Sequence, residues 1–133
     1  MKYLLPVIAL LISVSACKTL NKSADQPALE NTHWKLIALN QKPVNLGDNA
    51  FLELKDGDKI SGKAACNSFF GEYEARSKSI KFSKIGSTKM FCNNLMDQEN
   101  LILTNLQKVS RYEIRYGMLY LYDSDMLLMT FKK

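Results

Sequence analysis

The chain has 133 residues, of which 47% are hydrophobic and 23% are charged. This length and composition predict one packed globular domain, and they exclude a disordered or collagen-like chain. The formal net charge is +5, and the chain contains only 1 His and 3 Cys, which excludes a multi-histidine metal site.

Residues 1–16 have the features of a secretory signal peptide. Lys2 supplies a positive charge, and an apolar run of 11 residues follows at 4–14. This run is too short to span a bilayer, which requires about 20 residues. It ends in Val14-Ser15-Ala16-Cys17, which resembles the lipobox of bacterial lipoproteins. The resemblance implies cleavage before Cys17, a diacylglycerol on its sulfur and acylation of the new amino group. The alternative is an ordinary signal peptide.

The predicted location is the cell envelope. Lys18 follows Cys17, and the resemblance to Gram-negative lipoproteins implies that a residue other than Asp at this position directs sorting to the outer membrane. Three acyl chains would hold the protein firmly on the membrane, facing the periplasm. Residues 17–32 are polar without a sustained period and predict a lipidated flexible tether, which leaves residues 33–133 for the domain.

From residue 33 onward the hydrophobic pattern has mostly the period of two that is typical of β-strands. An Asp-Gly-Asp hairpin turn at 56–58 and further turns near 77–78, 117 and 123–125 separate the strands. The predicted strands are residues 34–39, 52–54, 60–64, 69–75, 80–82, 112–116, 119–122 and 127–131. This pattern predicts a mostly β fold, a small antiparallel β-barrel-like domain of about eight short strands.

Residues 94–109 have helical spacing instead. Leu95, Ile102, Leu106 and Val109 fall on one face, and Asn93 or Asn94 can cap the first turn. We predict one amphipathic α-helix of about four turns that covers an open end or edge of the sheet.

Cys66 and Cys92 are predicted to form a disulfide. The envelope is oxidising, and lipidation of Cys17 leaves an even number of thiols. A loop of about 26 residues would gain roughly 3.5 kcal/mol in the chain-entropy model. The alternative is two free buried thiols.

Two blocks, residues 62–73 and 88–92, resemble the META/HslJ domain family. They read GKAACNSFFGEY and TKMFC, and Trp34-Lys35-Leu36 precedes them. The resemblance covers residues 33–133 and implies a mostly antiparallel β-barrel-like domain with one helix. Family members are often envelope lipoproteins linked to heat shock, antibiotic tolerance or motility, and the resemblance implies no known reaction or ligand. Ala65 and Gln41 stand where the family usually has Gly. A positive φ at Ala65 would cost about 1 kcal/mol.

The remaining motif residues are predicted to be structural. Asn67 can satisfy backbone groups after a turn, and Gly71 within a strand indicates a bulge or a close backbone approach. A ligand-binding role for Asn67, Gly71 and Tyr73 is the alternative. The full set of structural motif residues is Trp34, Gly62, Asn67, Gly71, Tyr73 and Thr88.

The sequence predicts no catalytic residue, no cofactor and no metal site. His33 is the single histidine, and no pattern brings it to Cys66 as a base. Paired carboxylates are the other route to acid–base chemistry. Glu72 and Glu74 are better interpreted as a solvated strand face, and Glu99 as a helix partner for a backbone group or a tyrosine hydroxyl.

Two surfaces are candidates for binding. Tyr120 and Tyr122 would form an aromatic patch for a protein partner if they are exposed, whereas core or semi-buried packing is the alternative. Lys81 and Lys84 belong to a basic run that fits anionic lipid headgroups, and a solvated strand face is the alternative. Nucleic acid is not an expected partner in the envelope.

The predicted function is that of a lipid-anchored cell-envelope protein, a non-catalytic binding or scaffolding module in envelope stress or antibiotic tolerance. Its predicted partners are the membrane, through the lipid anchor, and an unknown envelope protein or anionic lipid. The alternatives are a barrel that binds a small apolar ligand and an inhibitor of an envelope enzyme.

Overall fold

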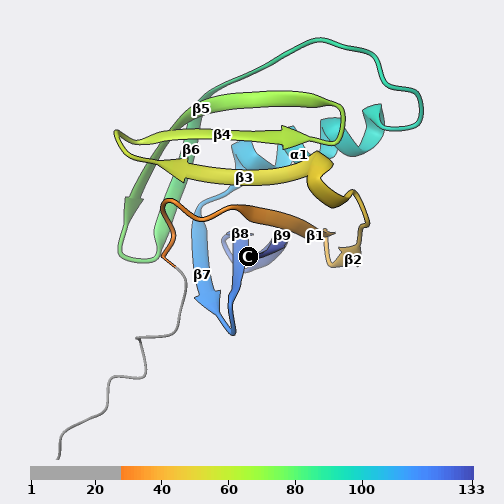
Figure 1. Ribbon diagram of the computed structural model, residues 1–133. Helices are drawn as coiled ribbons and strands as arrows, with labels where there is room; N and C mark the ends of the chain where they lie inside the picture. The colour runs from red at the N-terminus through yellow and green to blue at the C-terminus, as the bar shows by residue number, and fades with distance from the viewer. Residues whose placement is uncertain (1–27) are drawn as a thin grey trace, which may run out of the picture.

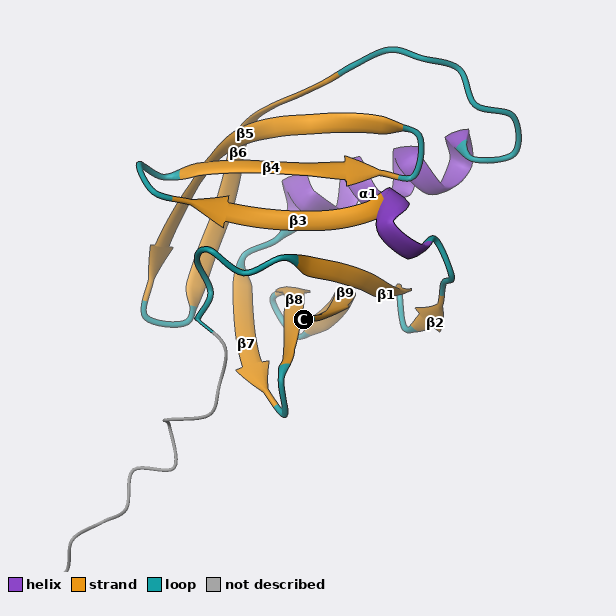
Figure 2. Ribbon diagram, in the orientation of Figure 1, coloured by secondary structure: helices purple, strands orange, loops and turns teal. Residues whose placement is uncertain are grey.

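The computed structural model describes residues 28–133, which form one antiparallel sheet closed into a ring (Figure 1, Figure 2). The sheet order is β2-β1-β3-β4-β5-β6-β7-β8-β9, and β1 also pairs with β9, which closes the ring. The strands are β1 (Trp34–Leu39), β2 (Lys42–Pro43), β3 (Ala50–Lys55), β4 (Lys59–Ala64), β5 (Asn67–Arg76), β6 (Ser79–Ser87), β7 (Arg111–Arg115), β8 (Met118–Asp123) and β9 (Met126–Lys132). The predicted mostly β, barrel-like fold with one helix is confirmed. Within the described residues, the short β2 adds a ninth strand to the eight predicted.

Large apolar side chains fill the interior of the ring. Buried residues alternate with more exposed ones in β3, β4 and β5, as the period of two predicts, whereas residues 128–131 of β9 are all buried. Trp34, Leu52, Leu119, Leu121 and Met129 have no exposed surface. A ring of this size has an interior that side chains can fill completely. This packing argues against the alternative of a barrel that holds an apolar ligand inside.

The helix α1 (Met96–Lys108) lies against β4 and β6. Ile102 and Leu106 are buried, as the helical spacing predicts. Leu95 occupies the N-cap position without a side-chain hydrogen bond, so the predicted cap by Asn93 or Asn94 is not formed. In the part of the chain that the structure describes, no helix has the length and hydrophobicity needed to cross a membrane.

Residues 28–32 pack against the ring instead of standing apart from it. The Trp34 indole Nε1 donates to the Leu29 carbonyl at 3.0 Å, and Asn31 N donates to the Leu54 carbonyl at 2.8 Å. The Tyr73 hydroxyl donates to the Glu30 carboxylate. The boundary predicted at residue 33 therefore falls inside a segment that contacts the domain. The predicted signal peptide and Cys17 lie outside the described residues.

The ring has two ends with different contents. The hairpin end holds the tips of the β5–β6 and β7–β8 hairpins and the β3–β4 turn, and Figure 1 shows the described chain beginning on this side. The helix end contains α1, the β4–β5 turn and residues 88–95. Strands β3 and β4 connect the two, because Leu54 pairs with Ile60 at the hairpin end and Ala50 pairs with Ala64 at the helix end. Four strand residues span about 13 Å, so the two ends present separate surfaces.

Candidate functional site

The candidate site is built around Asn67, a fully buried residue at the start of β5. Its side-chain Oδ1 accepts hydrogen bonds from the Thr88 hydroxyl at 2.8 Å and from Met90 N at 2.7 Å. Its Nδ2 donates to the Met90 carbonyl at 2.9 Å and to Glu99 Oε1 at 2.8 Å. An amide side chain has two donors and two acceptor positions, and all four are used here. Asn67 therefore fixes the backbone of the segment that begins at Thr88.

Glu99 supplies the second half of this network from α1. Its carboxylate is 4% exposed and also accepts the Asn67 backbone N–H at 2.6 Å. A buried carboxylate is stable only when donors surround it, and Asn67 provides two. The expectation that Glu99 is a helix partner for a backbone group is confirmed. The network joins α1 to the first residue of β5.

The disulfide holds the same segment at a second point. Cys66 and Cys92 are bonded, with their Cα atoms 5.8 Å apart, so the predicted pairing is present. The Cys66 sulfur also lies 3.7 Å from the Met90 carbonyl. Ala65, just before the bridge, has a φ of 67°, which is the left-handed conformation that glycine favours. The turn therefore has the positive φ that glycine usually adopts at this position, although the residue here is Ala65.

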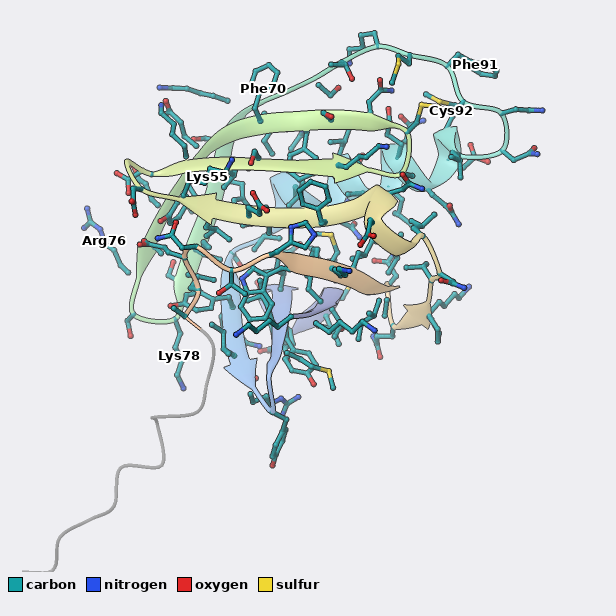
Figure 3. All side chains as sticks on the ribbon, viewed as in Figure 1. Lys55, Phe70, Arg76, Lys78, Phe91 and Cys92 are labelled. Carbon is teal, nitrogen blue, oxygen red and sulfur yellow. A yellow bond between two sulfur atoms is a disulfide. The ribbon has the colours of Figure 1, made fainter. Side chains whose placement is uncertain are left out.

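Residues 88–95, which we call the braced segment, present apolar side chains to solvent. Met90 is 58% exposed and Phe91 is 80% exposed. Figure 3 shows Phe91 pointing outward beside Cys92, away from the ring. An open pocket of about 370 Å³ adjoins them, and Asn67, Met96 and Leu103 are among its lining residues. The segment therefore combines a fixed backbone with exposed apolar side chains and a neighbouring hollow.

Met90 and Phe91 were not predicted from the sequence as an exposed surface. The block at residues 88–92 was interpreted as a family signature because of its cysteine. The available signal was the pair of large apolar residues beside a cysteine, in a stretch without the alternation of a strand. Such a stretch lies outside the regular elements, so the period of two or of 3.6 does not predict which of its side chains are buried.

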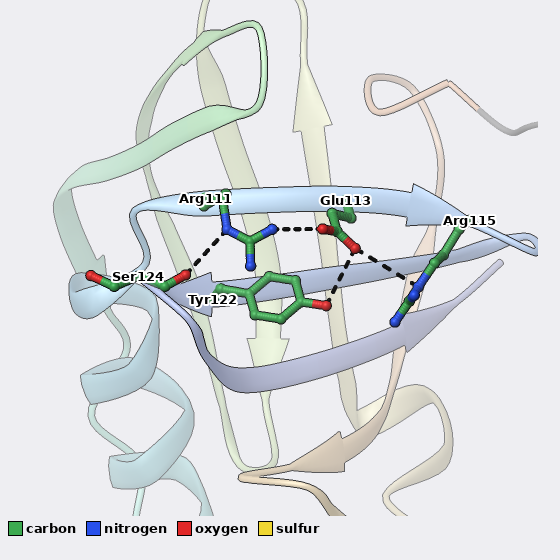
Figure 4. Close-up of polar contacts among 5 residues, drawn as sticks. All are labelled: Arg111, Glu113, Arg115, Tyr122 and Ser124. Carbon is green, nitrogen blue, oxygen red and sulfur yellow. Dashed lines mark hydrogen bonds and ion pairs between the residues drawn. The ribbon is translucent and has the colours of Figure 1, made fainter.

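The aromatic patch predicted at Tyr120 and Tyr122 is not formed. Tyr122 is 8% exposed, and the Arg111 guanidinium lies 3.9 Å from its ring centroid (Figure 4). The Arg115 guanidinium covers the Tyr120 ring at 4.7 Å. Both rings lie on the outer face of β8, as the alternation predicts, but arginines from β7 cover them. Semi-buried packing, the alternative interpretation, describes both rings better.

The cluster in Figure 4 is centred on Glu113. Arg111 Nη1 lies 2.7 Å from Glu113 Oε1, while Arg115 Nε is 3.8 Å and the Tyr122 hydroxyl 3.4 Å from Oε2. These contacts lower the pKa of Glu113, chiefly through the Arg111 hydrogen bond. Arg111 Nε also donates to the Ser124 carbonyl at 3.1 Å. The cluster braces the outer face of β7 and β8, and its carboxylate stays ionised at neutral pH.

The basic run at Lys81 and Lys84 is balanced by acidic residues of the neighbouring strand. Lys84 Nζ lies 2.7 Å from Glu72, and Lys59 Nζ lies 2.6 Å from the same carboxylate. These two bonds lower the pKa of Glu72 to about 2, and the Glu72 contact raises the pKa of Lys84. Lys81 faces Glu74 across the β5–β6 ladder. This face is therefore a solvated strand surface of mixed charge, as the alternative interpretation had it.

The other motif residues have structural positions. A Cβ on Gly62 would collide with the Phe51 carbonyl and the Phe69 ring. Gly71 sits at a register shift in β5, and a Cβ there would lie 2.8 Å from the Ser83 carbonyl, so both predicted reasons for this glycine hold. Tyr73 is buried, and this burial is the main cause of its raised pKa. His33 Nδ1 lies 2.7 Å from Glu53 Oε1 at the surface of β3.

The architecture defines the class of protein: a closed antiparallel β-ring with one helix at one end and a disulfide-braced segment beside it. A model of the META domain matches residues 27–133, so the chain belongs to the META domain family. The match begins just before the residues that pack against the ring.

Solved structures show the same fold. One NMR structure is 25% identical, covers 75% of this chain and 86% of that chain, and has a TM-score of 0.61. An NMR structure of a protein from Burkholderia xenovorans is 22% identical, covers 78% of this chain and 82% of that chain, and has a TM-score of 0.64. A search of curated proteins finds no match.

Proposed function

We propose that this chain is a lipid-anchored cell-envelope protein whose META domain is a non-catalytic module for binding another envelope protein. The sequence Val14-Ser15-Ala16-Cys17 after an apolar run supports the anchor. Lys18 in the following position supports the outer membrane as the site of attachment, with the domain in the periplasm and a role in envelope stress or antibiotic tolerance.

The braced segment is the observation that carries the binding role. Met90 and Phe91 expose apolar surface while Asn67, Thr88 and the disulfide fix the backbone beneath them. A segment that is already ordered loses little conformational entropy when a partner covers it. Aromatic side chains on such a segment are typical anchors of protein interfaces.

The position of this segment favours a protein over the bilayer as its partner. Residues 88–95 lie at the helix end, whereas Ala28 lies at the hairpin end (Figure 1, Figure 3). Since the lipid anchor precedes Ala28 in the chain, the hairpin end is the membrane-proximal one. Phe91 then points into the periplasm, where another envelope protein can meet it.

The ionisable groups support a role without catalysis. Among the described carboxylates, the shifted pKa values are those of Asp48, Glu53, Glu72 and Glu113, and all four are lowered by hydrogen bonds or ion pairs with neighbouring cationic or histidine side chains. A general acid or base needs a pKa near the working pH. Carboxylates held ionised in surface pairs are unsuited to that task.

Site-specific photocrosslinking in intact cells tests the binding role. A photoreactive residue at Phe91 is expected to give one protein adduct of defined mass, which disappears when Met90→Ser is added. Met126, which is 60% exposed, is the matched apolar control and is expected to give no such adduct. Equal adducts at both positions, or none at Phe91, would contradict the proposal.

Cell fractionation tests the anchor. Cys17→Ser is expected to move the protein from the membrane fraction to the soluble fraction after a carbonate wash, because the thiol that carries the diacylglycerol is gone. Ser15→Ala keeps a small residue at the cleavage site and is expected to stay membrane-bound. Retention of the Cys17→Ser protein on the membrane would refute lipid attachment at this residue.

A further inference from the structure

Exposed cationic side chains gather at the hairpin end of the ring. Arg76 and Lys78 stand at the tip of the β5–β6 hairpin and are exposed, and Figure 3 shows both pointing outward at the end where the described chain begins. Arg115 precedes the tip of the β7–β8 hairpin, with 54% of its side chain exposed. The C-terminal residues Lys132 and Lys133 are exposed as well. Lys132 joins this group because it pairs with Met118, just after the β7–β8 tip.

The β7–β8 tip also carries an aromatic side chain that the fold does not need. Tyr116 is 85% exposed. Tyr116 and Gly117 have φ values of 51° and 73°, the pattern of a two-residue type I′ turn. Asn is the favoured residue at the first of these positions, whereas a bulky side chain there strains the backbone. An exposed tyrosine in a strained turn points to a contact outside the domain.

Acidic groups offset only part of the positive charge of this end: Glu30 bonds to Tyr73, and Glu74 faces Lys81 across the β5–β6 ladder. Glu113 is already paired with Arg111 and Arg115. Asp56 and Asp58 belong to the β3–β4 turn of the same end, where Asn31 Nδ2 donates to Asp56 Oδ1 at 3.2 Å, and Lys55 and Lys59 flank this turn. Figure 1 shows the β3–β4 turn apart from both hairpin tips. The two tips and the C-terminus therefore share an excess of positive charge.

The chain leaves the domain at the same end. Ala28 is exposed there, and residues 18–27 separate it from Cys17. Ten residues can span at most about 35 Å. If Cys17 carries the lipid, as proposed above, this connection keeps the hairpin end close to the bilayer.

We propose that the hairpin end docks on the anionic headgroups of the membrane that holds the lipid anchor. Tyr116 lies at headgroup level, the position that tyrosine favours at membrane interfaces. Arg76, Lys78 and Arg115 are attracted to the lipid phosphates, and each basic residue near an anionic leaflet strengthens binding about fivefold. Docking in this orientation directs the braced segment away from the bilayer. The inference rests on the lipid anchor and adds the surface and its ligand.

Amine labelling of the purified lipidated protein on vesicles tests this orientation. One set of vesicles contains phosphatidylglycerol in phosphatidylcholine, and the other contains phosphatidylcholine alone. We expect Lys78 and Lys132 to be labelled at least about threefold more slowly on the anionic vesicles. Lys89, which is exposed at the helix end, is expected to be labelled at the same rate on both. High salt should abolish the difference.

Three variants make the test specific. Tyr116→Asn is expected to weaken the protection of Lys132 while raising the melting temperature, which separates docking from folding. Arg76→Gln with Lys78→Gln should lower the ratio of docked to undocked protein about thirtyfold. Lys63→Gln with Lys89→Gln removes two charges at the helix end and should leave the protection of Lys132 unchanged.

The outcomes that overturn the proposal are distinct. Equal labelling at both ends on anionic vesicles would refute docking while leaving the anchor intact. Protection of Lys132 that is the same on neutral vesicles would refute anionic headgroups and indicate contact with a second copy of the chain. Failure of the protein to float with either kind of vesicle would refute the anchor itself, and the docking with it.

Discussion

Replacing Asn67 by Asp is expected to make the stability of the domain depend steeply on pH. The two side chains have the same shape, so the bonds from Thr88 and Met90 N to Oδ1 are kept. The nitrogen that now donates to Glu99 Oε1 at 2.8 Å and to the Met90 carbonyl at 2.9 Å becomes an oxygen. Two buried carboxylates at that separation cannot both be ionised, so the pair must hold a proton.

The cost of that proton sets the magnitude. An aspartate has an ordinary pKa of about 3.9, and each unit costs about 1.4 kcal/mol. Holding a proton therefore costs about 4 kcal/mol at pH 7 and about 1.5 kcal/mol at pH 5. A protonated Asp donates once where Asn67 donates twice, and the lost bond adds about 1 kcal/mol at any pH. Asn67→Asp should thus lower the free energy of unfolding by about 5 kcal/mol at pH 7 and 2.5 kcal/mol at pH 5.

The sign follows from proton binding. The folded variant keeps a proton that the unfolded chain releases above about pH 4, so its stability falls as the pH rises. Thermal unfolding followed by circular dichroism should give a melting temperature about 10 °C higher at pH 5 than at pH 7. Asn67→Ala removes the bonds without adding a carboxyl group, and its difference between the two pH values should be much smaller. If both variants respond equally to pH, the buried contact of Asn67 with Glu99 is not present in solution.

Three further predictions concern the turns and the disulfide. Reduction of the disulfide between Cys66 and Cys92 removes a constraint across 26 residues, worth about 3.5 kcal/mol. Calorimetry should show a melting temperature more than 10 °C lower. A fall of less than about 3 °C would contradict the chain-entropy reasoning. Gln41 is exposed with a φ of 66°, so Gln41→Gly should raise the melting temperature by roughly 2–5 °C in the same assay. Ala65 has a similar φ of 67°, but its buried methyl group contributes about 0.8 kcal/mol. Ala65→Gly should therefore be nearly neutral, because the loss of this burial offsets the relief of backbone strain. A large gain in melting temperature would show that the two effects do not offset each other.

The hairpins of the fold could be predicted from the sequence because their signals are local. The turn at Asp56-Gly57-Asp58 requires positive φ, and Gly57 and Asp58 adopt it. Gly71 within a strand predicted a bulge or a close approach, and the structure has both. Each of these signals is contained within a few residues, so no knowledge of distant contacts was needed.

The contents of the site depended on contacts that the sequence does not encode locally. Glu99 and Asn67 are 32 residues apart and meet only when α1 is placed at the end of the ring. The aromatic patch predicted at Tyr120 and Tyr122 failed because Arg111 and Arg115 of the neighbouring strand cover the two rings. The basic run around Lys84 was interpreted along one strand, whereas Glu72 neutralises it from the next strand. The sequence shows that Lys84 is charged, but not that Glu72 of the adjacent strand lies beside it.

The two ends of the domain act together in the proposed function, because the braced segment alone offers little binding energy. Full burial of Met90 and Phe91 would contribute about 1.5–3 kcal/mol each. Their sum falls well short of the roughly 8 kcal/mol that a micromolar complex requires. A partner confined to the same membrane meets the segment at a high effective concentration, which raises the occupancy of a weak site without new contacts. Docking of the hairpin end would add to this by holding Phe91 in one direction, so that fewer orientations are lost when the complex forms. Loss of the lipid from Cys17 should therefore reduce photocrosslinking at Phe91 even though the segment itself is unchanged.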